Sequence, residues 1–257
     1  MVWFLTLLLT ISCIPGILFM LSSEKKILSS SEEDIPLLTR VITHILAVVL
    51  FSLAGSFFAI KTNLVDPFTK GILDGTFSWQ HFTELMQTGV TYGLICSIAN
   101  IAAYYFIFKR AVDADSFNKI EQHYQNMGIG ARIFYGGVIE EIIFRLGIMG
   151  FIIWLGSMIL STNNNILIWV AILISSILFA LAHVPGISSM GLKKTPAIMI
   201  YALGGNIWVG IWCGLAFLQA GIFAAIVVHI LFHLLWYPIQ MNSNKQRGSL
   251  HGTIIKK

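Results

Sequence analysis

Residues 133–159 read IFYGGVIEEIIFRLGIMGFIIWLGSMI, an apolar stretch that carries Glu140, Glu141 and Arg145 within six residues. A helix needs about 20 predominantly apolar residues to cross a bilayer, so this stretch is long enough to span one. An ionisable side chain at mid-bilayer costs about 2.5–3.5 kcal/mol, and three cost roughly 8–10 kcal/mol before they pair. Such residues face one another or a cavity and commonly carry function. We therefore expect a membrane helix that contributes to a polar site.

The composition of the whole chain also indicates a membrane protein. Of its 257 residues, 56% are hydrophobic and 11% are charged, and the mean hydropathy is +0.81. Soluble domains carry about a quarter charged residues, so a soluble fold would lack the polar residues to cover its surface. The sequence predicts an all-α polytopic membrane protein with about seven transmembrane helices, at residues 2–22, 41–60, 88–108, 133–159, 166–183, 197–219 and 221–240.

The basic residues are distributed unequally between the two sides of these spans. With the N-terminus outside, 13 of the 16 Lys and Arg residues fall inside, whereas Lys61 and Lys70 fall outside and Arg145 lies within a span. Because an excess of Lys and Arg marks the cytoplasmic side, we predict a cytoplasmic C-terminus with a basic tail at 241–257. The basic residues flank apolar stretches and line no single face, so we expect the lipid bilayer as a partner and no nucleic acid.

Helical geometry separates the two neighbouring glutamates. Glu141 and Arg145 are four residues apart, so we expect them to form a structural ion pair. Glu140 lies about 100° away from Glu141 around the helix axis and has no partner on its own helix. We therefore expect Glu140 to meet a partner from another helix and to do the chemistry. The alternative interpretation is that all three residues only hold the bundle together.

Three histidines fall at a similar depth in other predicted spans. His229 and His233 are four residues apart in the last span, so both rings project from one face at a spacing typical of metal ligands. His183 ends the span 166–183. At a rise of about 1.5 Å per residue, Glu140 and the two last-span histidines lie roughly 10–16 Å from the cytoplasmic ends of their helices. The sequence thus predicts a polar cavity, open to the cytoplasm, where one carboxylate meets three imidazoles.

These residues form three motifs in order along the chain, namely Glu140-Glu141-x-x-x-Arg145, Phe179-x-x-x-His183 and His229-x-x-x-His233. The pattern resembles the EExxxR, FxxxH and HxxxN or HxxxD motifs of the CAAX prenyl endopeptidase/Abi (CPBP) family of intramembrane proteases. The resemblance covers about residues 131–240, which it marks as a four-helix catalytic core. Residues 1–130 then form an N-terminal three-span membrane region. The last motif departs from the family, because His233 stands in place of Asn or Asp.

The resemblance implies an endopeptidase whose active site faces the cytoplasm. Its substrate would be a membrane-anchored protein or peptide, and some family members cut after a prenylated cysteine. Matched by position, Glu140 activates the water, His183 is its partner, and His229 and His233 complete the catalytic site.

Two mechanisms stay open for such a site. In the metal-free mechanism, Glu140 takes the proton of the water and the two histidines of the last span stabilise the oxyanion. In the metal mechanism, zinc is the cofactor, His183, His229 and His233 bind it, and Glu140 acts as base or fourth ligand.

Two non-catalytic functions stay open as well. Intramembrane Glu and His residues also serve transporters, as proton relays or cation sites. A scaffold or immunity protein could keep the same fold without catalysis. The polar groups gather in one half of the membrane, and the outer halves of the spans carry no charged residue. This asymmetry favours an enzyme over a transporter, whose path would continue to the far side.

Overall fold

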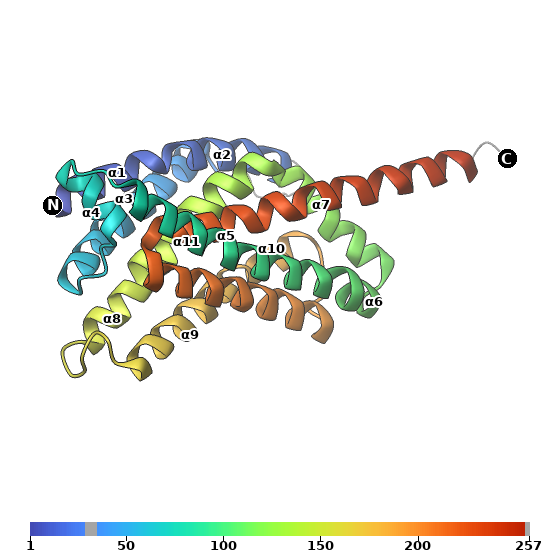
Figure 1. Cartoon of the computed structure of the whole chain (residues 1–257). Helices are drawn as coiled ribbons and strands as arrows, with labels where there is room; N and C mark the ends of the chain where they lie inside the picture. The colour runs from blue at the N-terminus through green and yellow to red at the C-terminus, as the bar shows by residue number, and fades with distance from the viewer. Residues whose placement is uncertain (29–34, 255–257) are drawn as a thin grey trace.

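The computed structural model describes the backbone of residues 1–28 and 35–254, and the side chains of 1–24 and 35–241. The described residues contain no strand, which confirms the all-α prediction (Figure 1). The α-helices and the π-helical segments, labelled η, are α1 (Val2–Ser12), α2 (Ile14–Leu28), α3 (Leu37–Lys61), α4 (Pro67–Asp74), α5 (Trp79–Ala102), η1 (Ala103–Phe108), α6 (Lys109–Ala111), α7 (Ala114–Ala131), η2 (Arg132–Glu140), η3 (Ile142–Met149), α8 (Gly150–Gly156), α9 (Asn165–Ala182), α10 (Val184–Ser189) and α11 (Pro196–Ile254).

Five helices in the described part of the chain are long and apolar enough to cross a membrane, and they cover Val2–Glu24, Leu37–Lys61, Trp79–Ala111, Asn165–Ser189 and Pro196–Met241. The chain is therefore an integral, multi-pass membrane protein. These five helices contain six of the seven predicted spans, because the last helix holds two of them. The remaining predicted span, 133–159, is the helical run from η2 to α8, which carries the three intramembrane ionisable residues.

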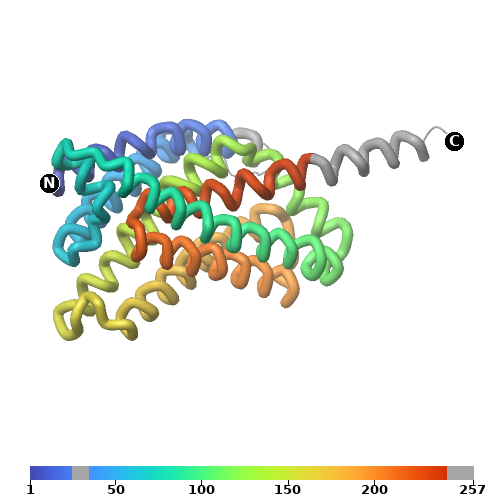
Figure 2. Tube along the Cα trace, in the orientation of Figure 1, coloured from blue at the N-terminus to red at the C-terminus, as the bar shows by residue number. Residues whose placement is uncertain are grey.

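The long helix α11 is broken in the middle. Ala220 (φ −144°) and Gly221 (φ 85°, ψ −175°) leave the helical conformation, and the chain reverses its direction between the two halves (Figures 1 and 2). The break lies at the predicted boundary between the spans 197–219 and 221–240. The left-handed backbone at Gly221 favours glycine, and a Cβ there would collide with the carboxylate of Asp66.

The helix that contains the glutamates departs from ordinary α geometry. Two π-helical segments, η2 and η3, lie on either side of Glu141. Such segments are rare and often occur at functional sites. η2 packs against α2, α7 and α11, and η3 packs against α3 and α9. Because other helices surround this run, its ionisable side chains face protein and not lipid.

The parts of the predicted division pack closely together. From the N-terminal region 1–130, α3 packs against η3 and α5 packs against α11, both of which begin in the predicted core. In the predicted basic tail 241–257, the backbone of α11 continues to Ile254, and the side chains beyond Met241 lie outside those that the structure describes.

Candidate active site

A cavity of about 460 Å³ lies between η2, the junction of α9 and α10, and both halves of α11. All four residues predicted as catalytic line it, namely Glu140, His183, His229 and His233. The side chains of Glu140 and His183 are 18% and 35% exposed, whereas His229 is only 2% exposed. The cavity therefore leaves the carboxylate of Glu140 and the ring of His183 accessible, while His229 is buried in its wall.

Glu140 and His183 approach each other in this cavity. Oε2 of Glu140 lies 4.0 Å from Nε2 of His183, a distance that exceeds a direct hydrogen bond and suits a bridging water. Nδ1 of His183 lies 2.8 Å from the carbonyl oxygen of Phe179. Because a carbonyl only accepts, Nδ1 carries the hydrogen, and Nε2 of the neutral ring presents a lone pair on the side of Glu140.

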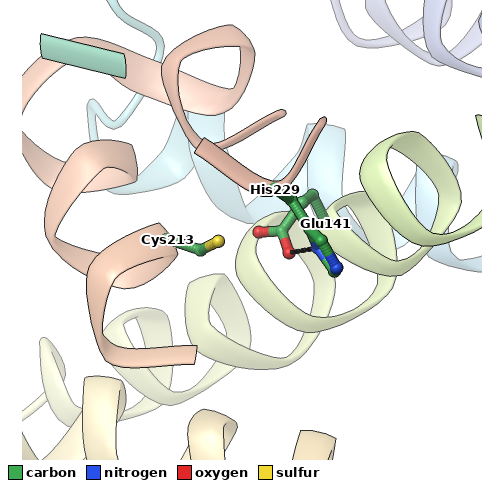
Figure 3. A group of neighbouring side chains, drawn as sticks. All are labelled: Glu141, Cys213 and His229. Carbon is green, nitrogen blue, oxygen red and sulfur yellow. Dashed lines mark hydrogen bonds and ion pairs between the residues drawn. The ribbon is translucent and has the colours of Figure 1, made fainter. Parts of the chain in front are cut away.

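Glu141 is completely buried and holds two partners. Its Oε2 lies 3.2 Å from Nε of Arg145, as the i,i+4 spacing predicts. Its Oε1 lies 2.7 Å from Nδ1 of His229 on α11, a contact that the sequence did not predict (Figure 3). A carboxylate paired with arginine only accepts hydrogen bonds, so Nδ1 of His229 is the donor. Glu141 therefore orients a histidine of the cavity as well as pairing with Arg145.

The two histidines of α11 present the same edge to η2. Their rings stack with centroids 5.0 Å apart. A Cβ on Gly136 would lie 3.0 Å from Nε2 of His233 and 3.8 Å from Nε2 of His229. Both Nε2 atoms therefore border the same small space, and the missing side chain of Gly136 keeps that space open.

Arg132 is a residue of the cavity that sequence reasoning missed, because it was counted among the basic residues flanking a span. It is 2% exposed and lines the cavity. Its Nε donates to Nδ1 of His233 at 3.4 Å, and its Nη1 donates to Oε1 of Gln240 at 2.7 Å. No sequence signal separates this arginine from one that extends to the lipid headgroups, because both stand at the end of an apolar stretch.

The donor atoms that gather most closely include only one of the predicted zinc ligands, His229. The predicted zinc ligands are His183, His229 and His233, with Glu140. Among the described residues, the metal-ligating atoms within 4.8 Å of one another belong to Glu141, Cys213 and His229 (Figure 3). This buried set offers the O, S and N donors that zinc takes, so it is compatible with a metal by donor type. The predicted set does not gather in this way.

A second cavity, of about 650 Å³, borders the first. It lies between α5, η1 and the first half of α11, and the exposed side chains of Ile107 and Ile200 line it. Asn100 and Tyr201 line both cavities. The Tyr201 hydroxyl donates to Oδ1 of Asn100 at 3.3 Å, and Nδ2 of Asn100 donates to the carbonyl of Gly205 at 3.3 Å. This cross-link between α5 and α11 separates a largely apolar groove from the polar cavity.

Comparison with known proteins finds a match for the segment that carries the four predicted catalytic residues. The family model described as type II CAAX prenyl endopeptidase Rce1-like matches residues 125–235, which include all three motifs. No curated protein and no solved structure matches the chain. The match confirms the resemblance drawn from the motifs. Residues 125–235 are therefore similar to the Rce1-like family of type II CAAX prenyl endopeptidases.

Proposed function

We propose that this protein is an intramembrane endopeptidase that hydrolyses a peptide bond of a membrane-anchored protein or peptide with a water activated by Glu140. The observation that carries the proposal is the approach of Glu140 to His183 at 4.0 Å within a cavity that also holds two further imidazoles. The distribution of basic residues supports an active site that faces the cytoplasm.

The hydrogen-bonding states of the two residues suit water activation. The carboxylate of Glu140 and the Nε2 lone pair of His183 are both acceptors, so a water between them directs its two hydrogens at them. A lone pair of the water oxygen is then free to attack a carbonyl carbon placed in the cavity. As the new C–O bond forms, one proton passes from the water to Glu140.

The attack leaves negative charge on the carbonyl oxygen, and the space beside Gly136 suits that oxyanion. Nε2 of His233 and Nε2 of His229 border this space. The Glu141 carboxylate accepts a hydrogen bond from Nδ1 of His229 and so fixes this ring beside the space. When the C–N bond breaks, the proton held by Glu140 passes to the leaving amine. Every step uses residues of the cavity and requires no metal.

The apolar groove supports a lipid-modified substrate, prenylated substrates among them. It borders the catalytic cavity at Asn100 and Tyr201, so a hydrocarbon chain in the groove would place the attached peptide at the edge of that cavity. Gly204 lines the groove, and a Cβ built there meets no atom within 4 Å. The groove therefore has room for a chain along the surface of α11.

The test is cleavage of a synthetic farnesylated peptide by the purified protein in proteoliposomes. We expect wild-type protein to cut the peptide and Glu140→Gln to be inactive, because the amide cannot accept the proton of the water. Glu84→Gln is the matched control, since Glu84 is an exposed glutamate outside this cavity. Cleavage by Glu140→Gln at the wild-type rate would refute the assignment.

A chelator distinguishes the two mechanisms in the same assay. The metal-free mechanism predicts full activity after treatment with EDTA. Activity lost to the chelator and restored by added zinc would establish the metal mechanism instead.

A further inference from the structure

The three histidines of the catalytic cavity do not carry their hydrogens on the same ring atom. Nδ1 of His183 and Nδ1 of His229 each face an acceptor, a carbonyl and a carboxylate. Nδ1 of His233 instead faces Nε of Arg132 at 3.4 Å. An arginine in a protein stays protonated and has no acceptor atom. Nδ1 of His233 must therefore be the acceptor, and the hydrogen of the neutral ring lies on Nε2.

We propose that Arg132 is a positioning residue that holds His233 as a hydrogen-bond donor toward the cavity. The Nε2–H group of His233 then points into the space beside Gly136, where the oxyanion of the proposed hydrolysis forms. The inference rests on the proposed function for its role in catalysis, although the position of the hydrogen stands on the contact with Arg132 alone. It also means that Nε2 of His233 offers no lone pair to a zinc ion while Arg132 is in place.

A buried chain of hydrogen bonds holds Arg132 in this position. Its Nη1 donates to Gln240 at 2.7 Å, and Nε2 of Gln240 donates to Oε1 of Glu121 at 3.4 Å. The hydroxyl of Tyr104 donates to the same oxygen at 2.6 Å. Glu121 is 1% exposed, so this network anchors Arg132 to the buried part of the protein through Gln240.

Two aromatic rings fix the plane of the guanidinium. Its central carbon lies 5.3 Å from the ring centroid of Tyr124 and 5.8 Å from that of Tyr237. A planar cation packed against two rings keeps its Nε–H direction, which a lysine ammonium on a flexible stem would not. The direction of this Nε–H group determines which ring nitrogen of His233 carries the hydrogen.

The position of the hydrogen can be measured directly in the wild-type protein. We expect ¹⁵N NMR of histidine-labelled protein to show a pyrrole-type Nε2 and a pyridine-type Nδ1 for His233, and the reverse for His183 and His229. Single His→Gln variants assign the signals. A pyrrole-type Nδ1 on His233 would overturn the proposal, whether or not the protein cleaves peptides. Failure of the proposed function alone would leave this measurement intact.

Its role in catalysis is tested by pairing two substitutions. An asparagine amide carries a donor N–H in every state, so His233→Asn should make Arg132 dispensable for the oxyanion. We expect Arg132→Met to lower kcat about 10²-fold in the wild-type background, the cost of one lost oxyanion donor, and less than about 3-fold in the His233→Asn background. A purely structural role for Arg132 predicts equal losses in both backgrounds. The proposal would be overturned if Arg132→Met lowered kcat equally in both backgrounds or left kcat unchanged when His233 is present. An inactive His233→Asn variant would overturn it as well.

Discussion

Replacing Glu141 with glutamine separates the two contacts of the buried carboxylate. An amide offers one acceptor oxygen, so it can serve His229 or Arg145 but not both. It also removes the negative charge beside Arg145. The guanidinium would keep its contact with the ring of Phe179, whose centroid lies 5.3 Å from its central carbon. Both Glu141 and Arg145 are 0% exposed, so water cannot compensate the arginine. Glu141→Gln should therefore lower both stability and activity.

The expected size of each effect follows from the burial of the pair. Removing one partner of a buried ion pair costs about 3–5 kcal/mol. At about 2–4 °C per kcal/mol for a chain of roughly this size, the melting temperature should fall by about 6–20 °C. The loss of the contact that orients the His229 ring should lower kcat by about 10²-fold in the fraction that stays folded.

A double variant distinguishes the ion pair from the orientation of His229. Replacing a buried pair with apolar residues of similar volume is often neutral for stability, so Glu141→Met combined with Arg145→Met should restore the melting temperature. It should not restore cleavage, because His229 still lacks its carboxylate. Thermal unfolding in detergent and initial cleavage rates, measured on the same preparation, give both quantities. Wild-type cleavage by the double variant would refute the claim that Glu141 orients His229.

Three further substitutions test other parts of the structure. Gly136→Ala should lower kcat at least about tenfold without changing the melting temperature, because its Cβ would occupy the space 3.0 Å from Nε2 of His233. Gly221→Ala should destabilise the protein by at least about 1–3 kcal/mol in thermal unfolding, because φ is 85° and the Cβ would collide with Asp66. Gly204→Leu should slow cleavage of a farnesylated peptide while leaving cleavage of the same peptide without its lipid unchanged; equal slowing of both peptides would exclude the groove as the lipid site.

The sequence predicted those features that leave a mark on local composition. Apolar runs marked the spans, and the boundary between 197–219 and 221–240 coincides with the break at Gly221. The i,i+4 spacing predicted the contact of Glu141 with Arg145. Glu140 had no partner on its own helix, and this led to the expectation of a contact from another helix, which is the approach to His183.

What the sequence could not predict depends on how helices cross. The bond between Glu141 and His229 requires the register of η2 and η3 against α11, and a residue already satisfied on its own helix gives no sign of a second partner. Arg132 turns inward to Gln240 and His233, although a basic residue at the end of a span has the same local pattern when it reaches the headgroups. The roles of the four predicted catalytic residues remain predictions that the experiments above address.

Because of the π-helical segments around Glu141, the direction in which Glu140 points depends on the number of residues in this helix. A π-helical turn holds one residue more than the α-helical turn it replaces, because each hydrogen bond closes over five residues in place of four. Deleting a single residue from η2 would let the ladder return to α pitch and would turn Glu140 to a different direction. The neighbouring helices could keep their packing while the carboxylate left the imidazoles. A one-codon deletion is thus a short route by which the same bundle could lose the proposed reaction and survive as an inert membrane protein.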